Sequence, residues 1–271
     1  MFKTTLLVDP RARASFASRR RLRSRNLLSK SAYYTAAGLI VVPFLDMVKA
    51  SVRCGLVSAR QIAIPATFIQ GLMVLLAWSY FNVTAVQSGI GHLADFKASM
   101  GMAFSFVSMG SIAVFAESLK RLATKSKEEQ SFALSAGFAF IVFGTLGVLT
   151  DLFYLAQNQL WSGLAPRAQI VAKVLTDQFV WTVLWANPYQ TLLYTWKDCG
   201  FKSSVMATRI MPFRLFYVRE MLAVLFMNWV FWIPVTAIIY SLPLNLQLPI
   251  CQLAIVVWIL LLMGMTRKEI E

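Results

Sequence analysis

Long uninterrupted apolar runs are the feature that most limits what this chain can fold into. A helix needs about 20 apolar residues to cross the hydrocarbon core of a bilayer, and six runs approach or exceed that length. The runs cover residues 62–81, 98–116, 132–156, 170–196, 221–242 and 248–265. They are continuous and do not alternate between apolar and polar residues, which favours helices over the strands of a membrane barrel. The sequence therefore predicts an all-α, multi-pass transmembrane helical bundle.

Composition and charge exclude two other classes of protein. With 58% hydrophobic and only 14% charged residues, the chain has too little polar surface for a soluble enzyme. Lys and Arg outnumber Asp and Glu by 26 to 12, but the basic residues lie between the apolar runs. That placement is typical of residues that orient a membrane protein, so we do not expect nucleic acid as a partner.

Residues 32–48 form a weaker apolar segment, which the charge distribution places at the membrane surface. The segment is short, contains Pro43 and runs into Asp46 and Lys49. If it does not cross, 23 of the 26 basic residues share one side of the membrane, in agreement with the positive-inside rule. We therefore predict six spans, an interfacial or re-entrant helix within residues 32–60, and both termini on a cytosol-like or matrix-like side.

A basic polar tail precedes the apolar part of the chain. Residues 1–31 contain nine Lys and Arg residues and one acidic residue, Asp9. Such a tail serves as an anchor that fixes orientation, as a contact for anionic lipid or as an organellar transit sequence, and the anchor is the favoured interpretation. Beyond the tail and residues 32–60, we expect an added two-helix segment at 61–130 and a four-helix membrane domain at 131–271.

Ionisable residues inside a span cost about 2.5–3.5 kcal/mol each at the centre of the bilayer, so each needs a partner or water. Lys173 and Asp177 are four residues apart in the fourth run, which places them on one helical face and predicts an ion pair, with Gln178 beside it. Asp151 follows Gly144 and Gly147, where small residues let a second helix approach and a basic or amide partner meet the carboxylate.

Two interpretations of these residues stay open. Together with Asn228 and Trp232 of the fifth run, Lys173, Asp177, Gln178 and Asp151 are candidates for a polar pathway through the bundle. The same residues also fit a buried structural ion pair and ordinary packing of helices. The sequence alone does not choose between these interpretations.

The sequence contains no recognisable catalytic or metal-binding motif. There is no phosphate-binding glycine loop, and Cys54, Cys199 and Cys251 lie too far apart to suggest a disulfide framework or a zinc site. The single histidine, His92, falls in a predicted loop without a nucleophile pattern near it. We therefore expect neither enzyme activity nor a cofactor or metal.

Several segments resemble the peroxisomal 22-kDa membrane protein and Mpv-seventeen family. Residues 173–178 (KVLTDQ) are similar to its K-x-x-x-D-Q motif, and residues 228–232 (NWVFW) to its N-aromatic-aromatic-x-W segment. The resemblance covers residues 131–265. It implies a four-helix membrane domain in a small protein of organellar or bacterial membranes, in a family proposed to form nonselective pores.

These observations favour a passive pore or small-solute pathway along the Lys173 and Asp177 face, with Asp177 setting charge selectivity. A non-catalytic structural or assembly protein of a membrane complex is the alternative. We expect the chain in a bacterial inner membrane or in a mitochondrial inner or peroxisomal membrane. Expected partners are the lipid bilayer, anionic lipid through the basic tail, and further copies of the chain or other members of a membrane complex.

Overall fold

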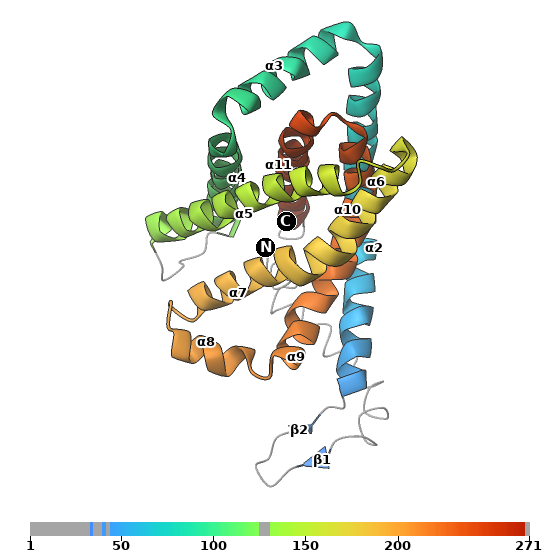
Figure 1. Ribbon diagram of the computed structural model, residues 1–271. Helices are drawn as coiled ribbons and strands as arrows, with labels where there is room; N and C mark the ends of the chain where they lie inside the picture. Colours follow the sequence, from blue (N-terminus) through green and yellow to red (C-terminus); the bar gives the residue numbers. More distant parts are fainter. Residues whose placement is uncertain (1–32, 35–39, 42–43, 125–130, 269–271) are drawn as a thin grey trace. The chain divides into compact units, whose positions relative to one another are not determined.

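The computed structural model describes residues 33–34, 40–41, 44–124 and 131–268 (Figure 1). Side chains are described within these ranges except at 33–34, 40–41, 123–124, 223, 258 and 260–268. The basic tail, residues 1–31, lies outside the described residues. In chain order the elements are β1 (Tyr33–Tyr34), β2 (Ile40–Val41), α2 (Phe44–Asn82), α3 (Thr84–Met100), α4 (Met102–Thr124), α5 (Phe132–Leu160), α6 (Pro166–Leu175), η2 (Thr176–Ala186), α7 (Asn187–Asp198), α8 (Ser203–Ile210), α9 (Phe213–Phe216), η3 (Tyr217–Leu222), α10 (Ala223–Ser241) and α11 (Leu244–Lys268), where η marks a π-helix.

The chain divides into two compact units. Unit 1 consists of residues 1–59 and 188–227, and unit 2 of residues 60–187 and 228–271. In unit 1, β1 and β2 pair antiparallel, with Tyr33 opposite Val41. Unit 2 holds the packed helices that carry most of the predicted polar residues.

Four helices are long and apolar enough to cross a membrane, counted over the described residues alone. They are Phe44–Asn82, Met102–Leu122, Phe132–Leu160 and Val224–Ser241. On α2 the apolar side chains of Ile64, Phe68 and Trp78 are 84%, 60% and 58% exposed. An exposed face of this kind is costly in water and is suited to lipid. These are the features of a multi-pass helical membrane protein.

Two of the predicted spans are not among these helices. Residues 170–196 are divided among α6, η2 and α7, and polar residues lower the hydropathy of that stretch. The apolar part of α11 with described side chains, Leu244–Val257, is shorter than a full span. The count of six spans therefore stays a prediction.

The described residues of the segment 32–48 do not form the separate helix that we predicted. They lie in β1, in β2 and in the first turns of α2, which continues without interruption to Asn82. Pro43 precedes the first residue of α2, a place where proline does not interrupt a helix. Residues 44–60 therefore belong to the same helix as the first predicted span.

The predicted loop around His92 is also wrong, because residues 84–100 form α3. None of the residues of α3 is buried, so a polar stretch forms a helix here without a buried apolar face. The helix ends at Gly101, whose φ of 55° suits glycine and separates α3 from α4. The second predicted span therefore begins at Met102 rather than near residue 98.

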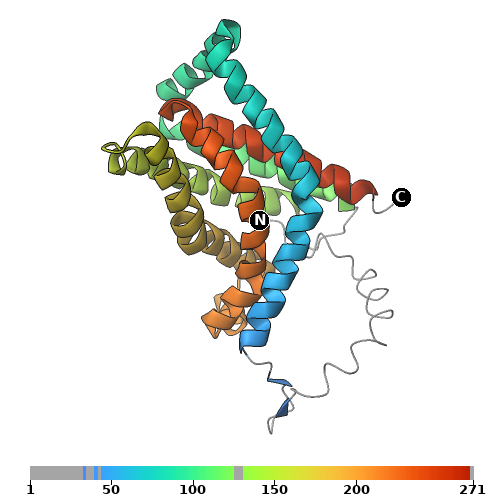
Figure 2. The same cartoon turned by 90° about the vertical axis from the view of Figure 1, so that its right-hand side faces the viewer.

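Helices α4 and α5 pack against each other at unusually short range, while α11 contacts α3, α4 and α5 in the same unit (Figure 2). A Cβ atom added at Gly147 would lie 2.4 Å from the carbonyl oxygen of Ser105, and one added at Gly144 would lie 2.9 Å from that of Phe106. A Cβ at Gly110 of α4 would meet the Phe140 carbonyl oxygen at 2.9 Å. Glycines on both helices thus permit backbone contact, as the sequence predicted for Gly144 and Gly147.

Substitution Gly147→Ala tests this contact. The added methyl group has no space against the α4 backbone, so the free energy of unfolding should fall by about 1–3 kcal/mol. Gly137→Ala on the same helix is a matched control, because a Cβ there has nothing within 4 Å. It should leave stability unchanged or raise it by about 0.5–1 kcal/mol. Unfolding in mixed micelles measures both variants, and equal effects would contradict the close contact.

Candidate functional site

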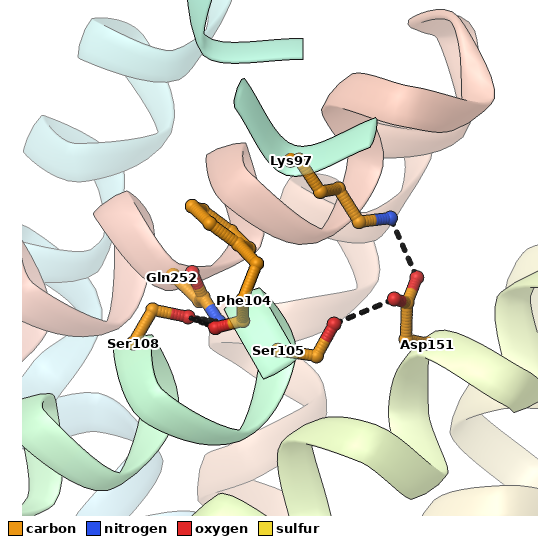
Figure 3. A network of polar contacts seen from close by, with 6 residues as sticks. All are labelled: Lys97, Phe104, Ser105, Ser108, Asp151 and Gln252. Carbon is orange, nitrogen blue, oxygen red and sulfur yellow. Dashed lines mark hydrogen bonds and ion pairs between the residues drawn. The ribbon is translucent and has the colours of Figure 1, made fainter. Parts of the chain in front are cut away.

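Asp151 of α5 lies at the centre of the first buried polar network in unit 2 (Figure 3). Its Oδ1 is 2.6 Å from the Lys97 amino group at the end of α3, and Ser105 of α4 donates a hydrogen bond of 2.6 Å to Oδ2. The side chains of Lys97 and Asp151 are 11% and 6% exposed. The carboxylate therefore has the basic partner that the sequence predicted, and it joins three helices.

A second contact ties α11 to α4 in the same view (Figure 3). The Gln252 side-chain amide donates to the Ser108 hydroxyl at 2.8 Å, and that hydroxyl donates to the carbonyl oxygen of Phe104. The Phe104 ring packs edge-on against Phe96 of α3, with centroids 5.9 Å apart. Polar and aromatic contacts thus link α3, α4 and α11.

Asp177, near the start of η2, lies in a second network. The Tyr240 hydroxyl donates a hydrogen bond of 2.5 Å to its Oδ2. Oδ1 accepts weaker bonds from Gln178 at 3.3 Å and from Thr182 at 3.5 Å. The Gln157 amide donates to the Tyr240 hydroxyl at 2.8 Å, which continues the network to α5. All five side chains belong to buried residues.

Lys173 has other partners than the predicted one. Its amino group donates to the Asn158 side-chain oxygen at 2.9 Å and lies 5.9 Å from the centre of the Tyr240 ring. None of the ion pairs found among the described residues includes Asp177. The spacing rule assumes α-helical turns, but α6 ends at Leu175 and the wider π-helix begins at Thr176. The predicted Lys173–Asp177 pair is therefore not formed in this structure.

Gln178 connects the second network to α10. Asn228 donates from its side chain to Gln178 Oε1 at 3.3 Å, and the Trp229 indole donates to the Gln178 backbone oxygen at 3.0 Å. This hydrogen bond provides a partner for a backbone carbonyl oxygen in a π-helix, where the α-helical pattern of backbone hydrogen bonds is interrupted. Trp232 packs edge-on against Phe231, with centroids 4.9 Å apart, and contributes no described hydrogen bond to the network.

Tyr240, Gln157 and Thr182 take part in the second network but were not among the predicted site residues. A local signal existed for Gln157, which follows Asp151 and Tyr154 at intervals of three and shares their buried face of α5. Tyr240 is 63 residues from Asp177 in sequence, so only the fold brings them together. Among the described residues no group of three or more His, Cys, Asp and Glu side chains is placed to hold a metal ion.

A double-mutant cycle on Lys97 and Asp151 tests the first network. Lys97→Met alone or Asp151→Leu alone leaves one buried charge unpaired, and each should lower the free energy of unfolding by about 3–5 kcal/mol. The double variant should lose much less than the sum of the two. The exposed pair of Lys49 and Asp46, 3.9 Å apart, is the control and should contribute about 0–1 kcal/mol. Additive losses at Lys97 and Asp151 would show that the pair is not coupled.

Comparison with known proteins identifies no relative. No family model matches the sequence, and no curated protein or solved structure is similar enough to match it. The resemblance of residues 131–265 to the peroxisomal 22-kDa membrane protein and Mpv-seventeen family therefore stays a prediction.

Proposed function

We propose that the Asp177 network is the narrow part of a passive pathway for small polar solutes or ions across a membrane. One observation carries the proposal: the Asp177 carboxylate is buried, and its hydrogen-bond donors among the described residues are the neutral groups of Tyr240, Thr182 and Gln178. A buried carboxylate without a cation is expensive in a membrane protein, and such residues most often mark ion or solute pathways.

The neighbouring polar residues extend this pathway along the bundle. Gln178 and Asn228 continue it toward α10, and Lys173, which donates to Asn158, lies beside the Tyr240 ring. In this structure each of these groups is hydrogen-bonded to a neighbouring side chain, which corresponds to a closed state of the pathway. Opening requires that a hydrated solute replace the hydrogen bond between Tyr240 and Asp177.

A structural or assembly protein of a membrane complex is the second candidate. It is favoured by the close backbone contact of α4 with α5 and by the buried pair of Lys97 and Asp151, which fix how the helices pack. In that case the Asp177 network sets the register of the helices and transports nothing. Both candidates belong in a bacterial inner membrane or in a mitochondrial inner or peroxisomal membrane, where further copies of the chain or other subunits are the expected partners.

Bilayer recordings on the purified chain separate the two candidates. The parent protein should conduct small ions, and Asp177→Asn should shift the reversal potential in a salt gradient toward anions, because the variant removes the negative charge of the Asp177 network. Asp46→Asn is the matched control: it removes a charge from an exposed carboxylate and should leave selectivity unchanged.

Two results would decide against the pathway. A folded parent protein without any conductance favours the assembly protein. Conductance with the same selectivity in the parent protein and in Asp177→Asn would place the pathway elsewhere in the chain. Thermal unfolding in the same detergent checks that each variant is folded before it is recorded.

A further inference from the structure

The segment between α7 and η3, in unit 1, is unusually basic. No Asp or Glu occurs between Asp198 and Glu220, whereas Lys202, Arg209, Arg214 and Arg219 all lie there. Three of them are exposed: Lys202 lies just before α8, Arg209 in the last turn of α8 and Arg214 in α9. The surface that they form therefore carries positive charge without a nearby carboxylate in the same segment.

Apolar side chains are exposed on the same short stretch. Val205, Met211 and Phe213 are 47%, 67% and 42% exposed, and none of the residues of α8 is buried. A short helix that presents both apolar and basic side chains, without a core of its own, is suited to the boundary between lipid headgroups and acyl chains. There the apolar side chains enter the hydrocarbon while the basic side chains reach outward.

Contacts within unit 1 relate this stretch to a candidate span. The Arg214 guanidinium lies 4.3 Å from the centre of the ring of Phe44, the first residue of α2. The same stretch also leads, through η3, into α10, whose apolar window begins at Val224. Arg214 thus precedes that window by ten residues, at the end of a candidate span where the lipid headgroups would lie.

We propose that Lys202, Arg209 and Arg214, with Val205, Met211 and Phe213, form a binding surface for anionic phospholipid, which we call the α8–α9 surface. Arg and Lys donate charge-assisted hydrogen bonds to the lipid phosphate, and the three apolar residues contact the acyl chains. Because the surface also exposes apolar residues, it is suited to bind a lipid rather than a soluble phosphate. The proposal is independent of the basic tail and of any pathway at Asp177.

Lipid titration of the full-length protein in mild detergent, followed by native mass spectrometry, tests the surface. The probes are short-chain phosphatidylglycerol and, as the uncharged comparison, phosphatidylcholine. Each basic side chain near an anionic surface contributes about fivefold in affinity. The double variant Lys202→Gln with Arg209→Gln should therefore bind phosphatidylglycerol about 25-fold more weakly and phosphatidylcholine as before. This variant leaves Arg214 and its contact with Phe44 intact, and its unfolding temperature should match that of the parent protein.

The matched control is Arg60→Gln with Arg167→Gln, which removes two exposed basic residues of unit 2. It should keep the affinity for phosphatidylglycerol, and glycerol 3-phosphate at equal concentration should not displace the lipid. Unchanged phosphatidylglycerol binding in the α8–α9 variant overturns the proposal. So does a loss of binding confined to the control variant, and displacement by glycerol phosphate would show a soluble-phosphate site instead.

Discussion

Polar groups inside a membrane protein have no bulk water to bond to, and this constraint shapes unit 2. Backbone groups satisfy their hydrogen bonds by forming helices, and buried polar side chains do so by bonding to one another. Asp151 bonds to Lys97 and Ser105, and Asp177 to Tyr240 and its neighbours. The bonds of Lys97 and Ser105 to Asp151, and of Tyr240 to Asp177, join residues from different helices, so satisfying these polar groups also determines which helices are neighbours.

The contact between α4 and α5 shows how packing and polar bonding depend on each other. Gly147 lets the α5 backbone approach the carbonyl oxygen of Ser105, and Asp151, one turn later on α5, accepts the hydroxyl hydrogen bond of the same serine. A larger residue at position 147 would move the helices apart and lengthen that hydrogen bond. The glycine is therefore part of the support for the buried ion pair, although it has no side chain of its own.

Sequence patterns predicted those features that depend on neighbours along the chain. Apolar runs located the four helices long enough to span, and the small residues before Asp151 indicated both a close helix and a basic partner. The pairing of Lys173 with Asp177 failed because it assumed α-helical spacing where a π-helix begins. Tyr240 was not predicted, since its role depends on a contact across 63 residues of sequence. Partners supplied by distant segments leave no local pattern to recognise.

The two networks differ in how charge is balanced, and this difference separates their roles. The Asp151 carboxylate lies 2.6 Å from the Lys97 amino group, so any rearrangement that separates them leaves two unpaired charges in an interior of low polarity. Such a pair holds helices together. Asp177 is bonded to hydroxyl and amide groups, which can exchange one neutral partner for another, or for water or a solute, at a smaller cost. Of the two carboxylates, Asp177 is therefore the one whose partners can be replaced at the smaller cost, whereas separating Asp151 from Lys97 is the more costly change.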